Sequence, residues 1–109
     1  MNEVVIATGI RTPVGNFGGT LEDVSAHKLG GRAVRKMITR ADVDPPLIDD
    51  VAMGCVGPSS DAGNVPRMIG LMAGLPIPIP AYSIPGNCSS GLQPGVNAYQ
   101  NIQREDVDV

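Results

Sequence analysis

The fold is decided by residues 83–92, which read SIPGNCSSGL. The apolar start is typical of a short strand, Pro85-Gly86 breaks that strand, and a helical pattern follows from Cys88 onward. A thiol at a helix start lies beside unpaired amides and the positive end of the helix dipole, which favour a thiolate and can hold an oxyanion. Most unpaired cysteines are buried hydrophobic residues, but the small neighbours of Cys88 suit a nucleophile approached by an acyl group. We therefore predict a catalytic cysteine.

Strand-like and helical segments alternate along the rest of the chain. Apolar runs predict strands at residues 4–7, 49–56 and 81–84, the first of them buried on both faces. Helical patterns begin at Ser25, Asn64 and Cys88. Because a βαβαβα order favours a parallel sheet with right-handed crossovers, we predict an α/β fold with a mostly parallel sheet.

Two segments outside these elements also carry a pattern. Residues 76–80 place proline at every second position, which predicts an extended lead-in at a sheet edge. Residues 106–109 alternate aspartate with valine and resemble the start of a further strand.

Each helical segment has one apolar face. Ser25 is a good N-cap for the first helix, and His27 falls outside its apolar stripe, which predicts a solvated side chain. Pro66 is tolerated in the first turn of the second helix. The third pattern turns Cys88 inward and places Pro94 beyond the first turn, where a proline is expected to kink the helix.

Length and composition limit what the chain does alone. Its 109 residues suffice for one domain or part of one, and 42% hydrophobic against 17% charged residues predicts surfaces covered by a partner or a missing segment. A formal charge of −3, without an evident cluster of Lys or Arg, argues against nucleic acid or an anionic membrane as the main partner.

The cysteine pattern indicates free thiols. Cys55 and Cys88 lack metal-ligand spacing, and a single histidine gives no zinc set, so we expect no metal. Free thiols are typical of a reducing compartment, and the first residues show no signal peptide, which together predict a cytoplasmic protein.

With these elements in place, the whole chain resembles the amino-terminal portion of a thiolase, the family that makes or cleaves 3-oxoacyl-coenzyme A thioesters. The resemblance rests on several ordered motifs with consistent spacing. They are Val4-Val5-Ile6, Arg11-Thr12-Pro13-Val14-Gly15, Phe17-Gly18-Gly19, Val43-Asp44-Pro45, Met53-Gly54, Asn64-Val65-Pro66-Arg67, Ala73-Gly74-Leu75-Pro76 and Asn87-Cys88-Ser89-Ser90-Gly91-Leu92.

The resemblance implies a role for one residue in particular. Cys88 would accept an acyl group from a coenzyme A thioester and pass it on, in a Claisen condensation or a thiolytic cleavage within fatty acid metabolism, with its backbone amide in the oxyanion hole. Coenzyme A thioesters would be substrates rather than bound cofactors. The residues that bind the substrate stay unknown at this stage.

The same resemblance implies that residues 1–109 are a partial thiolase amino-terminal domain. Family members are longer and add a coenzyme A loop domain and a carboxy-terminal half with two histidines and a second cysteine. We therefore expect either a truncated chain or a small subunit, inactive without the missing half or a partner chain. The expected assembly is a homo-oligomer, either a dimer or a tetramer, or a complex with a larger chain that carries the remaining half.

Rival interpretations stay open. A ketosynthase-like condensing enzyme shares the fold and the Cys-Ser-Ser pattern, and a noncatalytic structural subunit needs no reactive Cys88. A nucleophile at Ser89 or Ser90 is weaker, because neither lies in a G-x-S-x-G elbow; these serines are expected to satisfy backbone groups or line the pocket beside Cys88. For Arg67, contact with a ligand or a subunit is weighed against a salt bridge on the helix surface.

Overall fold

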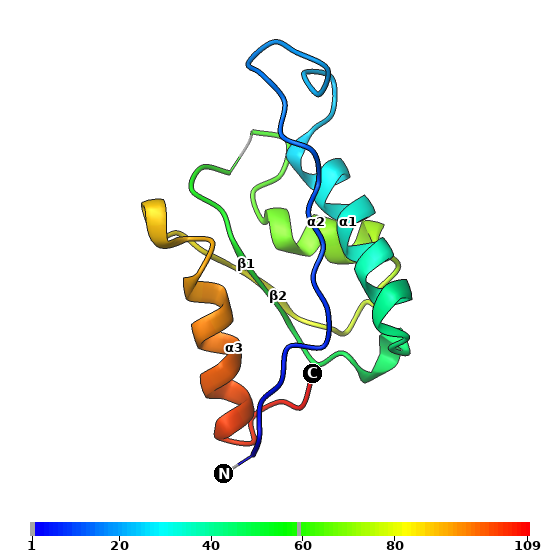
Figure 1. Cartoon of the computed structure of the whole chain (residues 1–109), viewed down its shortest axis with the longest axis vertical. Helices are drawn as coiled ribbons and strands as arrows, with labels where there is room; N and C mark the ends of the chain where they lie inside the picture. Colours follow the sequence, from blue (N-terminus) through cyan, green and yellow to red (C-terminus); the bar gives the residue numbers. More distant parts are fainter. Residues whose placement is uncertain (1, 59) are drawn as a thin grey trace.

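The computed structural model describes residues 2–58 and 60–109. Within these described residues, three α-helices, two strands and two short 3₁₀ turns follow one another (Figure 1). In order they are α1 (Ala26–Ala41), η1 (Pro45–Leu47), β1 (Val51–Gly54), α2 (Val65–Met72), β2 (Ala81–Ile84), η2 (Asn87–Ser89) and α3 (Gln93–Gln103). The alternating α/β order predicted from the sequence is confirmed from α1 onward.

β1 and β2 form a parallel pair with α2 in the crossover between them. The register pairs Val51 with Ala81 and ends with Gly54 opposite Ile84. Figure 1 shows α1 and α2 on one side of the strands and α3 on the other. β2 has the bounds predicted from its apolar run, whereas β1 covers only the centre of its predicted range.

The predicted first strand is not formed. Residues 4–7 have no regular structure, and Val5 and Ile6 are 73% and 94% exposed, so the prediction of a strand buried on both faces is wrong. A strand requires backbone hydrogen bonds to a neighbour, and within the described residues β1 and β2 pair only with each other. An apolar run without a partner strand stays irregular.

The end of the chain is likewise not a strand. Residues 107–109 are irregular, and they are tied to Asp49 just before β1. The Asp49 carboxylate accepts hydrogen bonds from the N–H groups of Asp108 at 2.7 Å and Val109 at 3.1 Å. The Asp49 N–H donates to the carbonyl of Val109 at 2.8 Å.

α1 begins directly after Ser25, as predicted, but its first turn differs from the expectation. The Ser25 side chain makes no capping bond; its Oγ lies 3.3 Å from Nε2 of His27. His27 is 8% exposed, so the prediction of a solvated side chain is wrong. Its ring turns toward the loop before α2, where Nδ1 lies 3.8 Å from Oδ2 of Asp61.

α2 starts where its sequence predicts and forms the centre of the core. The Asn64 side chain accepts from the N–H of Arg67 at 3.1 Å, and Pro66 lies in the first turn. Val65 and Ile69 are buried with Ala62. Partly buried side chains from α1, from β1 and from the residue after β1 pack against this cluster: Val34, Met53 and Cys55.

Two glycines let α1 approach α2. A Cβ on Gly30 would lie 2.4 Å from Cδ1 of Ile69, and a Cβ on Gly31 would lie 2.9 Å from Cβ of Met72. Since real carbon contacts are longer than this, a larger residue at either position would push the helices apart.

The proline-rich lead-in to β2 was expected to be extended, and this expectation is wrong. The N–H of Ile79 donates to the carbonyl of Pro76 at 3.1 Å, which closes a turn. Ile79 is buried and Ile77 is exposed. The chain reverses here because α2 must be followed by a strand parallel to β1.

α3 begins at Gln93 rather than at Cys88, and this changes the position of Pro94 within the helix. The proline occupies the first turn, where its missing N–H has no helical acceptor to lose, so the predicted kink does not arise. Tyr99 of α3 is 47% exposed and Leu92, the N-cap residue before the helix, is 75% exposed, which leaves apolar surface at α3 uncovered.

Candidate active site: the Cys88 turn

Cys88 lies in η2, on the connection between the carboxyl end of β2 and α3 (Figure 1). Its side chain is exposed, so the prediction that the thiol points inward is wrong. The reason is the 3₁₀ geometry, because Cys88 precedes the α-helix and does not belong to its apolar stripe. The thiol is thus open to a ligand, at the strand end where open parallel sheets commonly place their sites.

The two serines after Cys88 hold this turn together. Ser90 is buried, and its Oγ accepts from the N–H of Gly86 at 2.8 Å. The Ser89 Oγ donates to the carbonyl of Gly86 at 2.7 Å. The Ser89 N–H donates to that same carbonyl at 3.0 Å. The expectation that these serines satisfy backbone groups is confirmed.

Backbone conformation also shapes the turn. Asn87, directly before Cys88, has φ of 48°, in the left-handed region that asparagine tolerates better than most residues. The N–H of Ser90 donates to the Asn87 carbonyl at 3.1 Å. Among the described residues, no backbone or side-chain acceptor is paired with the Cys88 N–H.

Gly54, the last residue of β1, packs against the turn that carries Cys88. A Cβ on Gly54 would lie 1.8 Å from the carbonyl oxygen of Ser90, so the strand and the turn meet backbone to backbone. Only glycine allows this approach. Sequence reasoning missed this contact, although a glycine inside an apolar run was the available signal.

Arg67 of α2 and Asn64, the N-cap of that helix, position the lead-in to β2. The Arg67 guanidinium donates to the carbonyls of Ile79 and Ile77, both at 2.8 Å. The Asn64 amide donates to the carbonyl of Ala81 at 3.1 Å. The salt bridge expected for Arg67 is therefore wrong; instead, Arg67 orients the segment that leads through β2 to Cys88.

The amino ends of the strands carry the titratable groups with shifted pKa values. Hydrogen bonds from the backbone of Asp108 and Val109 lower the pKa of Asp49. Burial, with a smaller effect of the Asp49 charge, raises the pKa of Asp50. Burial and the Asp50 charge raise the pKa of Tyr82. None of these groups lies in the Cys88 turn.

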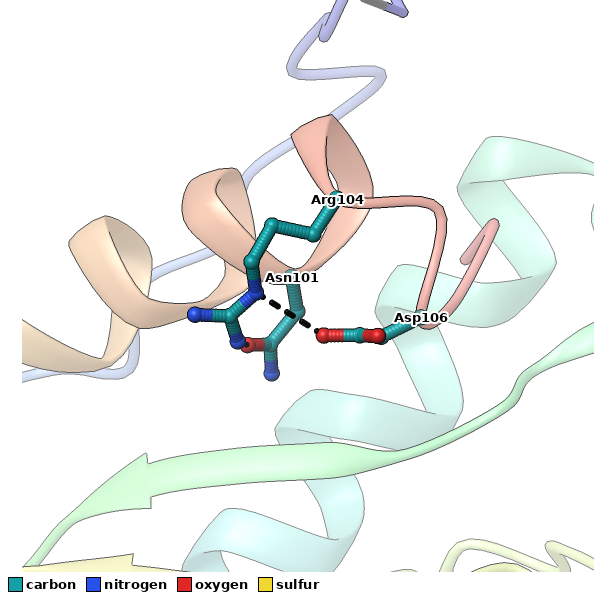
Figure 2. Close-up of polar contacts among 3 residues, drawn as sticks. All are labelled: Asn101, Arg104 and Asp106. Atoms are coloured by element: carbon teal, nitrogen blue, oxygen red, sulfur yellow. Dashed lines mark hydrogen bonds and ion pairs between the residues drawn. The ribbon is translucent and has the colours of Figure 1, made fainter.

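The other end of α3 is closed by a polar cluster (Figure 2). Arg104 donates from Nε to Asp106 at 2.9 Å and from Nη2 to Asn101 at 2.7 Å. Figure 2 shows the three side chains turned toward one another at the point where the helix ends. Because both partners lie within three residues of Arg104, this cluster fixes a local chain reversal.

The described residues show neither a metal-binding cluster nor a helix able to span a membrane. They contain no group of three or more His, Cys, Asp or Glu side chains placed to hold a metal ion. None of their helices combines the length and the hydropathy needed to cross a bilayer.

Cys55 is a free thiol packed against the core, in contrast to the exposed Cys88.

Comparison with known proteins identifies the class. The family described as "Thiolase, N-terminal domain" matches residues 4–109. The chain is 44% identical over 93 residues to an acetyl-CoA acetyltransferase of Clostridioides difficile, covering 85% of this chain and 87% of that sequence. This chain belongs to the thiolase family.

A longer relative and a solved structure agree with this assignment. An acetyl-CoA acetyltransferase of Syntrophomonas wolfei is 40% identical over 107 residues, which are 98% of this chain and 27% of the relative. The crystal structure of the Bacillus anthracis acetyl-CoA acetyltransferase superposes with a TM-score of 0.85 at 35% identity, over 91% of this chain and 25% of that one. The chain thus has a thiolase-like α/β fold and spans about 28% of the length of the first curated relatives it matches.

Proposed function

We propose that this chain is the part of a thiolase that carries the acyl-accepting nucleophile, and that Cys88 is this nucleophile. One observation carries the proposal: Cys88 is an exposed thiol on a turn that Ser89, Ser90 and Gly54 hold in place. Exposure alone is common, but an exposed thiol on a braced turn is the arrangement that covalent catalysis requires.

The proposed reaction has two steps. The Cys88 sulfur, as thiolate, attacks the thioester carbonyl of acetyl-coenzyme A, the bond from the acetyl carbon to the coenzyme A sulfur breaks, and coenzyme A leaves and takes up a proton. In condensation, a base removes a proton from the α-carbon of a second acyl-coenzyme A, that carbon forms a bond to the acetyl carbonyl carbon, and the Cys88 sulfur leaves as thiolate. In thiolytic cleavage the steps run in reverse: Cys88 attacks the 3-oxo carbonyl of the substrate, the adjacent carbon–carbon bond breaks, and the released carbon takes up a proton to give acetyl-coenzyme A. Coenzyme A then takes the acyl group from Cys88. The Cys88 N–H, which has no acceptor among the described residues, would donate to the oxyanion of each intermediate.

Complete turnover would need groups beyond this turn. The histidine of the described residues lies on α1 against Asp61 and Ser25, not beside Cys88. We therefore propose that residues 1–109 are a partial amino-terminal domain, and that the coenzyme A loop domain and carboxy-terminal half come from other sequence or a partner chain. The apolar surface that α3 exposes supports such an assembly, a homo-oligomer or a pairing with a larger chain.

The setting of the reaction is part of the proposal. The two free thiols support a reducing compartment, which we take to be the cytoplasm. Acetyl transfer between coenzyme A thioesters would place the protein in fatty acid metabolism.

The test measures single turnover. The 109-residue chain is mixed with acetyl-coenzyme A, and released coenzyme A is counted with a thiol reagent after the protein is removed. We expect up to one equivalent from the wild-type chain and from Cys55→Ser, but none from Cys88→Ser.

A parallel reaction offers acetyl-acyl carrier protein as donor. Acetylation from this donor alone would replace the thiolase proposal with a ketosynthase. Acetylation from neither donor, in a chain shown to be folded by circular dichroism, would leave a noncatalytic subunit.

A further inference from the structure

The positive charge of this chain is concentrated on one helix. Of eight Lys and Arg residues, five lie on α1, which has no acidic residue. The sequence-based expectation of no basic cluster is therefore wrong, although the whole chain has a formal charge of −3. The five are Lys28, Arg32, Arg35, Lys36 and Arg40.

Three of these cations surround a hollow between α1 and α2. The cavity has a volume of about 300 Å³ and is lined by Lys28, Gly31, Arg32, Arg35 and Met72. Residues 28, 32 and 35 are spaced by one helical turn each and share one face of α1. Gly31 keeps the two helices in close contact beneath them, since a Cβ there would approach Cβ of Met72 to 2.9 Å.

These three charges have no acidic partner within the described residues. The ion pairs among the described residues join His27 to Asp61 and Arg104 to Asp106. Neither pair includes a residue that lines the hollow. Like charges one turn apart destabilise a helix. An anion bound between the side chains would relieve this repulsion.

Arg35 is already oriented by the protein. It donates a hydrogen bond from Nη2 to the carbonyl of Met72, the last residue of α2. A guanidinium has five N–H donors, so this bond fixes the group and leaves donors for a ligand. Lys28 and Arg32 are exposed side chains that can close over the same space.

We infer that this hollow is a binding site for phosphate groups, with pyrophosphate or the phosphates of a nucleotide-like ligand as its occupant. Arginine forks match phosphate oxygens bidentately, and lysine adds a compact charge. The hollow has the size of a small-molecule site, whereas a flat basic face would suit a macromolecule. The inference does not depend on the role of Cys88.

The experiment measures pyrophosphate binding by isothermal titration calorimetry at low salt. Arg32→Ala should weaken binding about tenfold or more, the effect of one lost charge-assisted hydrogen bond. Lys36→Ala is the matched control, because it removes one charge from the same helix outside the hollow; it should change the affinity less than about twofold. Both variants are first compared with wild type by circular dichroism.

Further ligands distinguish the source of the phosphate. The phosphates of coenzyme A would be identified as the occupant by three results together. Coenzyme A binds more tightly than pyrophosphate, its binding needs Arg32, and pantetheine, which lacks the phosphates, does not bind. Equal binding of pyrophosphate and coenzyme A would identify a general phosphate site. Cys88→Ser should bind like wild type, which separates this test from that of the proposed function.

Three results would overturn the inference. They are no binding at millimolar pyrophosphate, equal losses in Arg32→Ala and Lys36→Ala, or a glutamate peptide that binds as tightly per charge as pyrophosphate. The last two would show a general cationic surface instead of a phosphate site.

Discussion

The two faces of the β1–β2 pair are packed in different ways. On the α2 face, Met53 of β1 contacts a closed cluster that includes Val65 and Ile69. On the α3 face, Gly54 meets the backbone of Ser90, and α3 leaves apolar side chains exposed. The face opposite the core thus carries the Cys88 turn, and a close backbone approach, not a filled core, sets the position of that turn.

The largest expected effect is on the α2 face. Ile69 is 2% exposed, so Ile69→Ala should lower the free energy of unfolding by about 2–5 kcal/mol. Leu92→Ala, at the exposed N-cap of α3, should change it by no more than about 0.5 kcal/mol. Urea unfolding followed by circular dichroism measures both, and similar losses would contradict the difference between the faces.

Gly54→Ala should have the next largest effect. Its Cβ cannot fit at 1.8 Å from the Ser90 carbonyl, so the turn must move, at a cost of about 1–3 kcal/mol or more. We also expect a changed rate of Cys88 alkylation in the folded protein. Gly57→Ala is the control, because nothing lies within 4 Å of a Cβ there; a Gly54 variant that behaves like this control would remove the proposed support from β1.

Substituting Ser89 or Ser90 should lower the free energy of unfolding by a smaller amount. Ser90→Ala leaves the Gly86 N–H without its acceptor and should cost about 1–3 kcal/mol. Ser89 is exposed and its carbonyl partner keeps a backbone donor, so Ser89→Ala should cost less. Thermal unfolding of the two variants gives their order, and the reverse order would assign the main bracing role to Ser89.

The smallest effect concerns the amino end of the strands. Backbone hydrogen bonds lower the pKa of Asp49, so their stabilisation is present above its ordinary pKa of 3.8 and is lost as the pH falls through the lower folded value. The protection of the Asp108 and Val109 amides against exchange, taken relative to the intrinsic exchange rate at each pH, should therefore fall only below about pH 4. Asp49→Asn should remove most of this pH dependence, and unchanged exchange at acid pH would contradict the assignment.

The parts of this fold that depend on local sequence were predicted better than the parts that depend on long-range contacts. α2 and β2 lie where expected, because capping by Asn64, the geometry of Pro66 and the apolar run at residues 81–84 set them locally. Residues 4–7 were misassigned because a strand also needs a partner, which no local pattern reveals.

The candidate site shows the same limit. Its central residue, Cys88, and the bonding role of the two serines followed from the sequence. The start of α3 did not, because helical periodicity continues through a 3₁₀ turn and gives no sign of the change in geometry. The burial of His27 and the contact of Gly54 with Ser90 depend on residues more than 30 positions apart in the chain.

We propose that the fold presents Cys88 to an acyl donor. The most direct measurement is a time course of acetylation by acetyl-coenzyme A, with the acetyl group located by peptide mass mapping. We expect acetyl on Cys88 and none on the core-packed Cys55 while the protein is folded. Acetylation of both cysteines at similar rates, or of Cys55 alone, would contradict it.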